Sequence, residues 1–179
     1  MTKAQVEAAL NQVTTAKNAL NGDANVRQAK SDAKANLGTL THLNNAQKQD
    51  LTSQIEGATT VNGVNSVKTK AQDLDGAMQR LETAIANKDQ TKASENYIDA
   101  DPTKKTAFDN AIIQAESYLN KDHGTNKDKQ AVEQAIQSVT STENALNGDA
   151  NLQRAKTEAT QAIDNLTHLN TPQKTALKQ

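Results

Sequence analysis

Apolar residues recur at spacings of three and four along most of this chain, which is the pattern that one face of an α-helix produces. Only two prolines, at positions 102 and 172, and seven glycines interrupt the pattern. No useful stretch alternates apolar and polar residues as a half-buried β-strand does. The hydrophobic pattern therefore predicts an all-α fold.

The longest uninterrupted pattern covers about 25 residues and places these residues on one face: Val64, Val67, Ala71, Leu74, Met78, Leu81 and Ile85. A helix of this length spans about 38 Å at 1.5 Å per residue. A helix of about half that length is enough for a small three-helix bundle. We therefore expect tandem three-helix bundles that share this long helix and form an elongated rod. Its first half closes one bundle and its second half opens the next.

Shorter patterns predict further helices at residues 3–20, 24–39, 44–57, 102–120, 126–146 and 150–166, and from 172 onward. Asn21-Gly22 is expected to end the first helix with glycine at positive φ, so that Asp23 caps the second. Asp101-Pro102 predicts a cap followed by proline at the first helical position, and Pro172 is assigned to that position as well.

The pattern stops between the long helix and the helix that begins near residue 102. Residues 88–101 are expected to form a loop, with Tyr97 and Ile98 packed against the core. The chain holds only three aromatic residues, and alanine is the commonest apolar one. Small side chains let helices approach closely, so we expect narrow cores of modest stability.

The chain also repeats itself, because residues 1–53 align without a gap with residues 127–179 and 25 of these 53 positions are identical. The longest identical block, Asn18 to Asn25, recurs as Asn144 to Asn151. Self-similarity over such a period is typical of a slice from a longer tandem array. The repeat predicts two central bundles at residues 21–76 and 77–146, preceded by one helix of another bundle at residues 1–20 and followed by two helices of the next at residues 147–179.

Charge and composition exclude several functions. The chain carries 20 Lys and Arg against 21 Asp and Glu, interspersed along the sequence, so no basic surface for nucleic acid is expected. No cysteine is present, which removes disulfides and thiolate metal sites. No signal peptide and no apolar run of about 18 residues is found, so no membrane insertion is expected. We expect a monomer.

Residues that often carry chemistry have structural explanations here. His42 and His168 share one repeat position and His123 lies in a predicted turn, none of them with a second ligand at helical spacing. Asp99 and Asp101 suggest a cation site, but one is a predicted helix cap and further ligands are missing. No nucleophile with a base, and no phosphate-binding glycine loop, is found. We therefore expect no enzyme, no cofactor and no metal.

Two local signatures resemble known modules. Residues 58–67 resemble the turn into the third helix of GA modules, the three-helix albumin-binding units of Gram-positive surface proteins. The segment from about Ala77 to Leu146, with Leu81, Ala84-Ile85, Tyr97, Ala107-Phe108, Ala111, Ala115 and Tyr118-Leu119, is similar to a FIVAR module. Alternation of the two at a 126-residue offset resembles the giant extracellular matrix-binding proteins of staphylococci.

The resemblance implies a cell-wall-associated, extracellular adhesin whose repeats form a helical stalk and whose partners include fibronectin. Within it, residues 21–76 and 147–179 are GA-like, and residues 1–20 and 77–146 are FIVAR-like. The alternative is a module that itself binds albumin or fibronectin, through the loop at residues 88–101 or through exposed side chains on the second GA-like helix. The candidate partner-binding residues on that helix are Gln47, Lys48, Thr52 and Gln54. No aromatic anchor for a partner's pocket accompanies them, which disfavours tight albumin binding.

Overall fold

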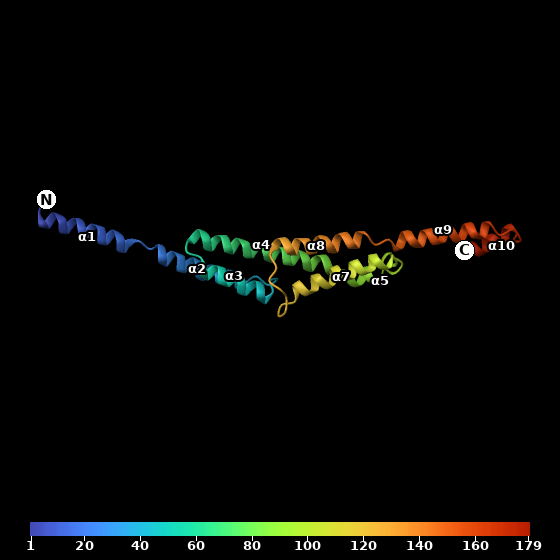
Figure 1. Cartoon of the computed structure of the whole chain (residues 1–179), viewed down its shortest axis with the longest axis horizontal. Helices are drawn as coiled ribbons and strands as arrows, with labels where there is room; N and C mark the ends of the chain where they lie inside the picture. The colour runs from blue at the N-terminus through green and yellow to red at the C-terminus, as the bar shows by residue number, and fades with distance from the viewer.

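The computed structural model describes all 179 residues, which form helices and connecting segments without a β-strand. The helices are α1 (Lys3–Ala19), α2 (Gly22–Gly38), α3 (Asn45–Gly57), α4 (Val61–Ile85), α5 (Lys88–Ala93), α6 (Glu95–Ile98), α7 (Pro102–Leu119), α8 (Lys129–Asn144), α9 (Gly148–Asp164) and α10 (Thr171–Lys178). They are arranged along a single long axis, several of them side by side, with the N-terminus at one end and α9 and α10 at the other (Figure 1). The predicted all-α, elongated architecture is confirmed.

The long helix α4 is shared between two three-helix bundles, as the hydrophobic pattern predicted. It has 25 residues, and its first turn is capped by Thr60, whose hydroxyl accepts a hydrogen bond from the Gly63 N–H at 2.9 Å. One bundle consists of α2, α3 and the first part of α4, and the other consists of the rest of α4 with α7 and α8 (Figure 1). Of the seven residues predicted on the buried face, Val67 is half-buried and the other six are buried.

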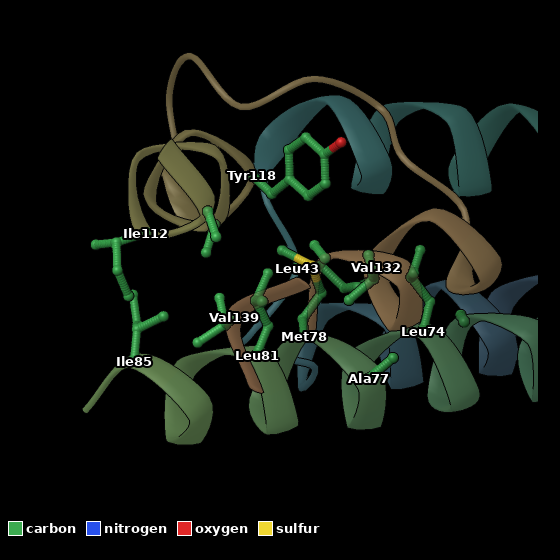
Figure 2. Close-up of a cluster of buried hydrophobic side chains, with 14 of the residues drawn as sticks. Leu43, Leu74, Ala77, Met78, Leu81, Ile85, Ile112, Tyr118, Val132 and Val139 are labelled. Atoms are coloured by element: carbon green, nitrogen blue, oxygen red, sulfur yellow. The ribbon is translucent and has the colours of Figure 1, made fainter. Parts of the chain in front are cut away.

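The two bundles have one continuous hydrophobic core. Twenty-two buried apolar residues form a single cluster that extends from Ala33 in α2 to Leu146 after α8. Figure 2 shows the middle of this cluster, where Leu43 from the α2–α3 turn approaches Met78 of α4, and Val132 and Val139 of α8 pack above α4. Because no layer of solvent divides the bundles at α4, they are joined by core packing as well as by backbone.

Several predicted helix boundaries were wrong. Helix α1 ends at Leu20 in an extended conformation, no glycine in the chain has a positive φ, and α2 already begins at Gly22. Asp23 therefore lies in the first turn of α2, where an acidic side chain is favourable, and Asn21 occupies the cap position. Pro172 is the second residue of α10, because Asn170 is its cap.

The segments that flank α7 also differ from the prediction. Residues 88–101 contain the two short helices α5 and α6 instead of a loop, and Ile98 is 51% exposed, whereas Tyr97 packs against the core as expected. Helix α8 begins at Lys129, capped by Asp128, three residues later than predicted. Residues 124–128 are non-helical because they cross from the end of α7 to α8 and contact the α2–α3 turn on the way.

The outer helices lack partners that their repeat copies have. Val6, Leu10 and Val13 on α1 are 51–65% exposed. The equivalent positions on α8, Val132, Ile136 and Val139, are buried or half-buried against α4 and α7. The same amphipathic sequence thus forms a helix in both places, and the neighbouring helices decide whether its apolar face is covered.

Candidate functional site at the module junctions

Polar side chains hydrogen-bond across two junctions: they are buried at the junction between the first and second bundles and half-buried at the junction between the second bundle and α9. No group of three or more His, Cys, Asp or Glu side chains is placed to hold a metal ion. None of the helices combines the length and apolar character needed to cross a membrane. The junctions are therefore the sites whose geometry calls for an explanation.

The first junction is built on the cap of α3. Asn44 and Gln47 form a reciprocal capping box, in which each side chain oxygen accepts a hydrogen bond from the other residue's backbone N–H at 2.9 Å. Both side chains are 0% exposed. Buried amides are costly unless all their hydrogen-bonding groups have partners, so their remaining N–H groups must find acceptors in the neighbouring bundle.

Those acceptors come from the last turn of α7 and from the segment between α7 and α8. The Asn44 amide donates to Tyr118 O at 3.0 Å and to Thr125 O at 2.9 Å, and the Gln47 amide donates to Lys127 O at 3.0 Å. The Asn45 N–H donates to Lys121 O at 2.8 Å. The cap of a helix in the first bundle therefore also satisfies the backbone of a connection in the second.

Gly124 makes room for this contact. A Cβ at this position would lie 2.5 Å from Asn120 O and 2.6 Å from Asn44 Nδ2, too close for any side chain. Its φ is not positive, so the requirement is space and not backbone conformation. His42 also connects the α2–α3 turn to α4. Its backbone N–H donates to Asp75 at 2.9 Å, and its Nδ1 lies 3.0 Å from a Glu82 carboxylate oxygen.

The candidate partner-binding residues on α3 are less available than the sequence suggested. Gln47 was expected to be exposed, and its complete burial in the junction contradicts that expectation. Lys48, Thr52 and Gln54 are each half-buried. The Thr52 hydroxyl donates to Lys48 O at 2.7 Å. The Gln54 side chain donates to an Asp50 carboxylate oxygen at 2.7 Å and accepts from Lys70 Nζ at 3.2 Å.

The second junction depends on the short helices α5 and α6, which Tyr97 anchors to the second bundle. Its ring meets Phe108 edge-on at 6.1 Å, and its hydroxyl donates to the Asp109 carboxylate at 2.9 Å. Burial and this hydrogen bond both raise the pKa of Tyr97. Because Tyr97 holds α6 in place, the residues after it present a fixed surface to the start of α9.

That surface binds the first turn of α9 through Asp101 and Asn147. The Asp101 N–H donates to Asn147 Oδ1 at 3.0 Å, and Asn147 Nδ2 donates back to Asp101 Oδ2 at 2.9 Å. Asn151 Nδ2 donates to Asp99 O at 2.9 Å and to Asp101 Oδ1 at 3.1 Å. The hydrogen bonds from Asn147 and Asn151 lower the pKa of Asp101, because they favour its charged form.

Asp101 occupies the cap position of α7, as predicted, but its side chain makes no cap hydrogen bond because it faces α9. Gly148 completes the contact. A Cβ on it would come within 2.5 Å of Asn96 O and closer still to Glu95 O, so α9 begins directly against the backbone of α6. The cap pattern at residues 101 and 102 therefore also marks an interface.

The repeat contains an uncovered copy of each junction. Asn170 and Gln173 form the same capping box as Asn44 and Gln47, at 3.0 Å in both directions, but they are exposed. A Cβ on Gly22, the copy of Gly148, would meet nothing within 4 Å. The sequence alone did not identify these junction contacts, although Asn-x-x-Gln and Asn-Gly-Asp-Ala-Asn recur unchanged in both copies.

Comparison with known families accounts for nearly the whole chain. The model of the FIVAR domain matches residues 1–21 and 77–147, more than half of the chain, and the model of the GA module matches residues 23–77 and 149–179. The chain belongs to the GA–FIVAR repeat family. Within this family it is 98% identical over 134 residues to the extracellular matrix-binding protein EbhA of Staphylococcus aureus strain Mu3, and 97% identical over 134 residues to EbhB of strain Newman.

These relatives are far longer than the chain, because the match covers 75% of the chain but only 2% of either protein. Solved structures of the GA–FIVAR repeat family agree with the fold. A crystal structure of an EbhA domain from S. aureus matches 98% of this chain and 73% of its own, with a TM-score of 0.94 and 51% identity. A structure from work on Embp-mediated adherence of Staphylococcus epidermidis to fibronectin matches 70% of this chain and 99% of its own, with a TM-score of 0.64 and 28% identity.

Proposed function

We propose that this chain is a structural segment of a giant cell-wall-associated adhesin, in which GA and FIVAR modules form a semi-rigid stalk that carries distal parts away from the cell. The observation that supports this most directly is α4, which runs through both bundles and lies in one continuous core. Bending at this junction would require breaking a helix and opening that core. Successive modules should therefore keep a fixed direction.

The phase of the repeat supports a wider arrangement of the same kind. Helix α1 is the copy of α8, so it is the last helix of a FIVAR-like bundle at residues 1–20. Helices α9 and α10 are the copies of α2 and α3, so residues 147–179 are the first two helices of the next GA-like bundle, and residues 21–76 and 77–146 are the complete bundles between them. The exposed apolar face of α1 is then covered by a neighbouring repeat of the same protein.

Small-angle X-ray scattering tests the stalk. A compact domain of this length would have a radius of gyration of about 16 Å. Helices α1, α4 and α9 lie in this order along the long axis and are separated by parts of α2 and α8 (Figure 1). Their summed length of about 90 Å at 1.5 Å per residue is a lower bound for the rod, so its radius of gyration should be at least about 26 Å. A value near 16 Å would overturn the proposal.

A substitution in α4 tests the stiffness of the shared helix. Met78 is 0% exposed in the middle of α4, and Met78→Pro removes a backbone hydrogen bond and introduces a clash, at a cost of about 3 kcal/mol or more. We expect the scattering profile of this variant to report a bent or broader ensemble. Met78→Leu, which conserves volume, is the matched control and should leave the profile unchanged. An unchanged profile for the proline variant would mean that α4 does not determine the direction of the modules.

Binding of a matrix protein is a second proposal, and it is favoured by the names of the relatives: EbhA is called an extracellular matrix-binding protein, and Embp is described as mediating adherence to fibronectin. On this chain, Lys48, Thr52 and Gln54 on α3 are the residues we propose for contact with fibronectin or serum albumin. Calorimetric titration of the whole chain with each protein tests this. Binding that is lost in Thr52→Ala but kept in Gln49→Ala, on the exposed side of the same helix, would support it. If the chain binds neither protein, the binding proposal is refuted and only the stalk proposal remains.

A further inference from the structure

The chain contains three Asn-Gly dipeptides, Asn21-Gly22, Asn62-Gly63 and Asn147-Gly148. Asparagine is a chemically labile residue, and it is most reactive before glycine, whose missing side chain leaves the backbone nitrogen unhindered. Two of the three dipeptides are copies of one another within the repeat, in identical eight-residue blocks. They differ only in what surrounds them, so the structure offers an internal comparison of reactivity.

The reaction is deamidation, and it needs no reagent except water. The glycine backbone nitrogen loses its proton and forms a bond to the asparagine Cγ, and the side-chain nitrogen leaves with that proton as ammonia. The resulting five-membered succinimide then takes up one water molecule and opens to aspartate or isoaspartate. The side chain must rotate toward the following nitrogen before the bond can form, so whatever holds the side-chain amide in another position slows the reaction.

The two copies have the same backbone and different side-chain partners. Asn21 has φ −123° and ψ 22°, and Asn147 has φ −127° and ψ 22°. Asn21 is exposed, and its side chain has only a 3.4 Å contact from Asn25. Asn147 is held at both ends of its amide by Asp101, at 3.0 Å and 2.9 Å, and the following Gly148 is buried against α6.

We propose that Asn147 is a guarded deamidation site: the closed junction between α6 and α9 protects it, and opening of the junction makes it as reactive as Asn21. The third dipeptide is protected by another means. Asn62 lies inside α4, and the Gly63 N–H that would have to attack donates to the Thr60 hydroxyl at 2.9 Å. The expected order of reactivity is therefore Asn21 well ahead of Asn147 and Asn62.

Deamidation at Asn147 would also prevent the junction from closing again. The new carboxylate cannot donate the hydrogen bond that Asn147 Nδ2 gives to Asp101, and it places a second negative charge where that bond was. An isoaspartate would in addition insert a backbone atom at the first turn of α9. An opening event that lasts long enough for reaction would thus become permanent. This inference does not depend on the stalk or on matrix binding.

The test is to incubate the whole chain in mildly alkaline buffer below its unfolding temperature and to follow each site by peptide mass spectrometry. Cleavage after lysine and arginine separates the sites into peptides 18–27, 49–68 and 130–154. We expect Asn147 to react roughly tenfold more slowly than Asn21, because a hydrogen bond to a charged group must break first. Equal rates at the two copies in the folded chain would overturn the proposal.

Asp101→Ala removes the carboxylate that holds the Asn147 side chain. It should raise the deamidation rate at Asn147 to that of Asn21 without changing the rate at Asn21. Asp99→Ala is the control, because Asp99 contributes only its backbone oxygen to the junction. If Asn147 still reacts slowly in both variants, the Asp101 carboxylate does not protect it and the proposal fails. Far-UV circular dichroism verifies that both variants are folded.

Two further variants imitate the product. Asn147→Asp should accelerate amide hydrogen exchange in α6 and in the first turn of α9, whereas Asn21→Asp should change neither. An Asn147→Asp variant whose exchange matches the parent chain would show that the junction tolerates the product, and the permanent opening would be refuted.

Discussion

Replacing Asn44 by alanine should destabilise the two central bundles together. Asn44 is 0% exposed, and its side chain makes three hydrogen bonds. Its oxygen caps α3, and its amide nitrogen donates hydrogen bonds to Tyr118 O and Thr125 O, which belong to the other bundle. Asn44→Ala removes all three bonds at once and leaves the two carbonyl groups without this donor.

The size of the effect follows from these groups. Loss of an N-cap costs about 0.5–2 kcal/mol. Each of the two buried acceptors left without a partner costs about 1–3 kcal/mol, so the cap and the two acceptors together cost about 2.5–8 kcal/mol. Asn170→Ala is the matched control, because Asn170 makes the same capping box but is exposed and serves no other module. It should cost about 1 kcal/mol, confined to α10.

Urea denaturation followed by far-UV circular dichroism measures both variants. With a slope of about 2 kcal/mol per molar urea, Asn44→Ala should lower the main midpoint by about 1–4 M, and Asn170→Ala should leave that midpoint unchanged. One transition for both bundles is expected, because they share α4 and a single core. If the two variants lie within about 1 kcal/mol of each other, the junction adds nothing to the cap and the reasoning is refuted.

Three further changes probe the same junctions. Gly124→Ala places a Cβ 2.6 Å from Asn44 Nδ2 and should cost about 1–3 kcal/mol in urea denaturation. Gly148→Ala should separate α9 from α6, visible as faster hydrogen exchange in α9, whereas Gly22→Ala should be neutral or stabilising by up to about 1 kcal/mol because nothing lies near its Cβ and alanine favours helix. Hydrogen bonds from Asn147 and Asn151 lower the pKa of Asp101 in the folded chain. The stability that the Asp101 carboxylate contributes is therefore fully present above pH 3.8, the ordinary pKa, and is lost as the pH falls through the lower pKa of the folded chain. Amide NMR signals of Asn147 should therefore shift only in acid below 3.8, and in Asp101→Asn they should not.

Hydrophobic periodicity was sufficient to predict α4 because burial along a helix is a local signal. The spacing of Val64, Leu74 and Leu81 places them on one face wherever that face is covered, and their number exceeds what one small bundle needs. The cap position of Asp101 was predicted for the same reason, since the signal of a cap followed by proline is complete within two residues.

Hydrophobic periodicity could not predict which polar residues form hydrogen bonds across the junctions. Gln47 lies on a helix rich in polar residues, and its partner Lys127 O is 80 positions away in the sequence. Periodicity distinguishes apolar from polar positions, but it does not indicate which polar residue will have an acceptor brought to it by another module. The same holds for Asp101, whose pattern as a helix cap is complete without α9, although its side chain faces α9.

The two junctions are of different physical kinds, and this bears on how the chain would respond to load. At α4 the modules are joined by an unbroken helix and by buried apolar side chains, so separating them requires exposing core. Between α8 and α9 the helix is interrupted at residues 145–147, and the contact relies on Asp101, Asn147, Asn151 and the close fit of Gly148. A few exposed or half-buried hydrogen bonds exchange readily with water and contribute much less than a core. In an array built from repeats of this kind, helical junctions would alternate with polar junctions, and extension would begin at the polar junctions while the paired bundles remain folded.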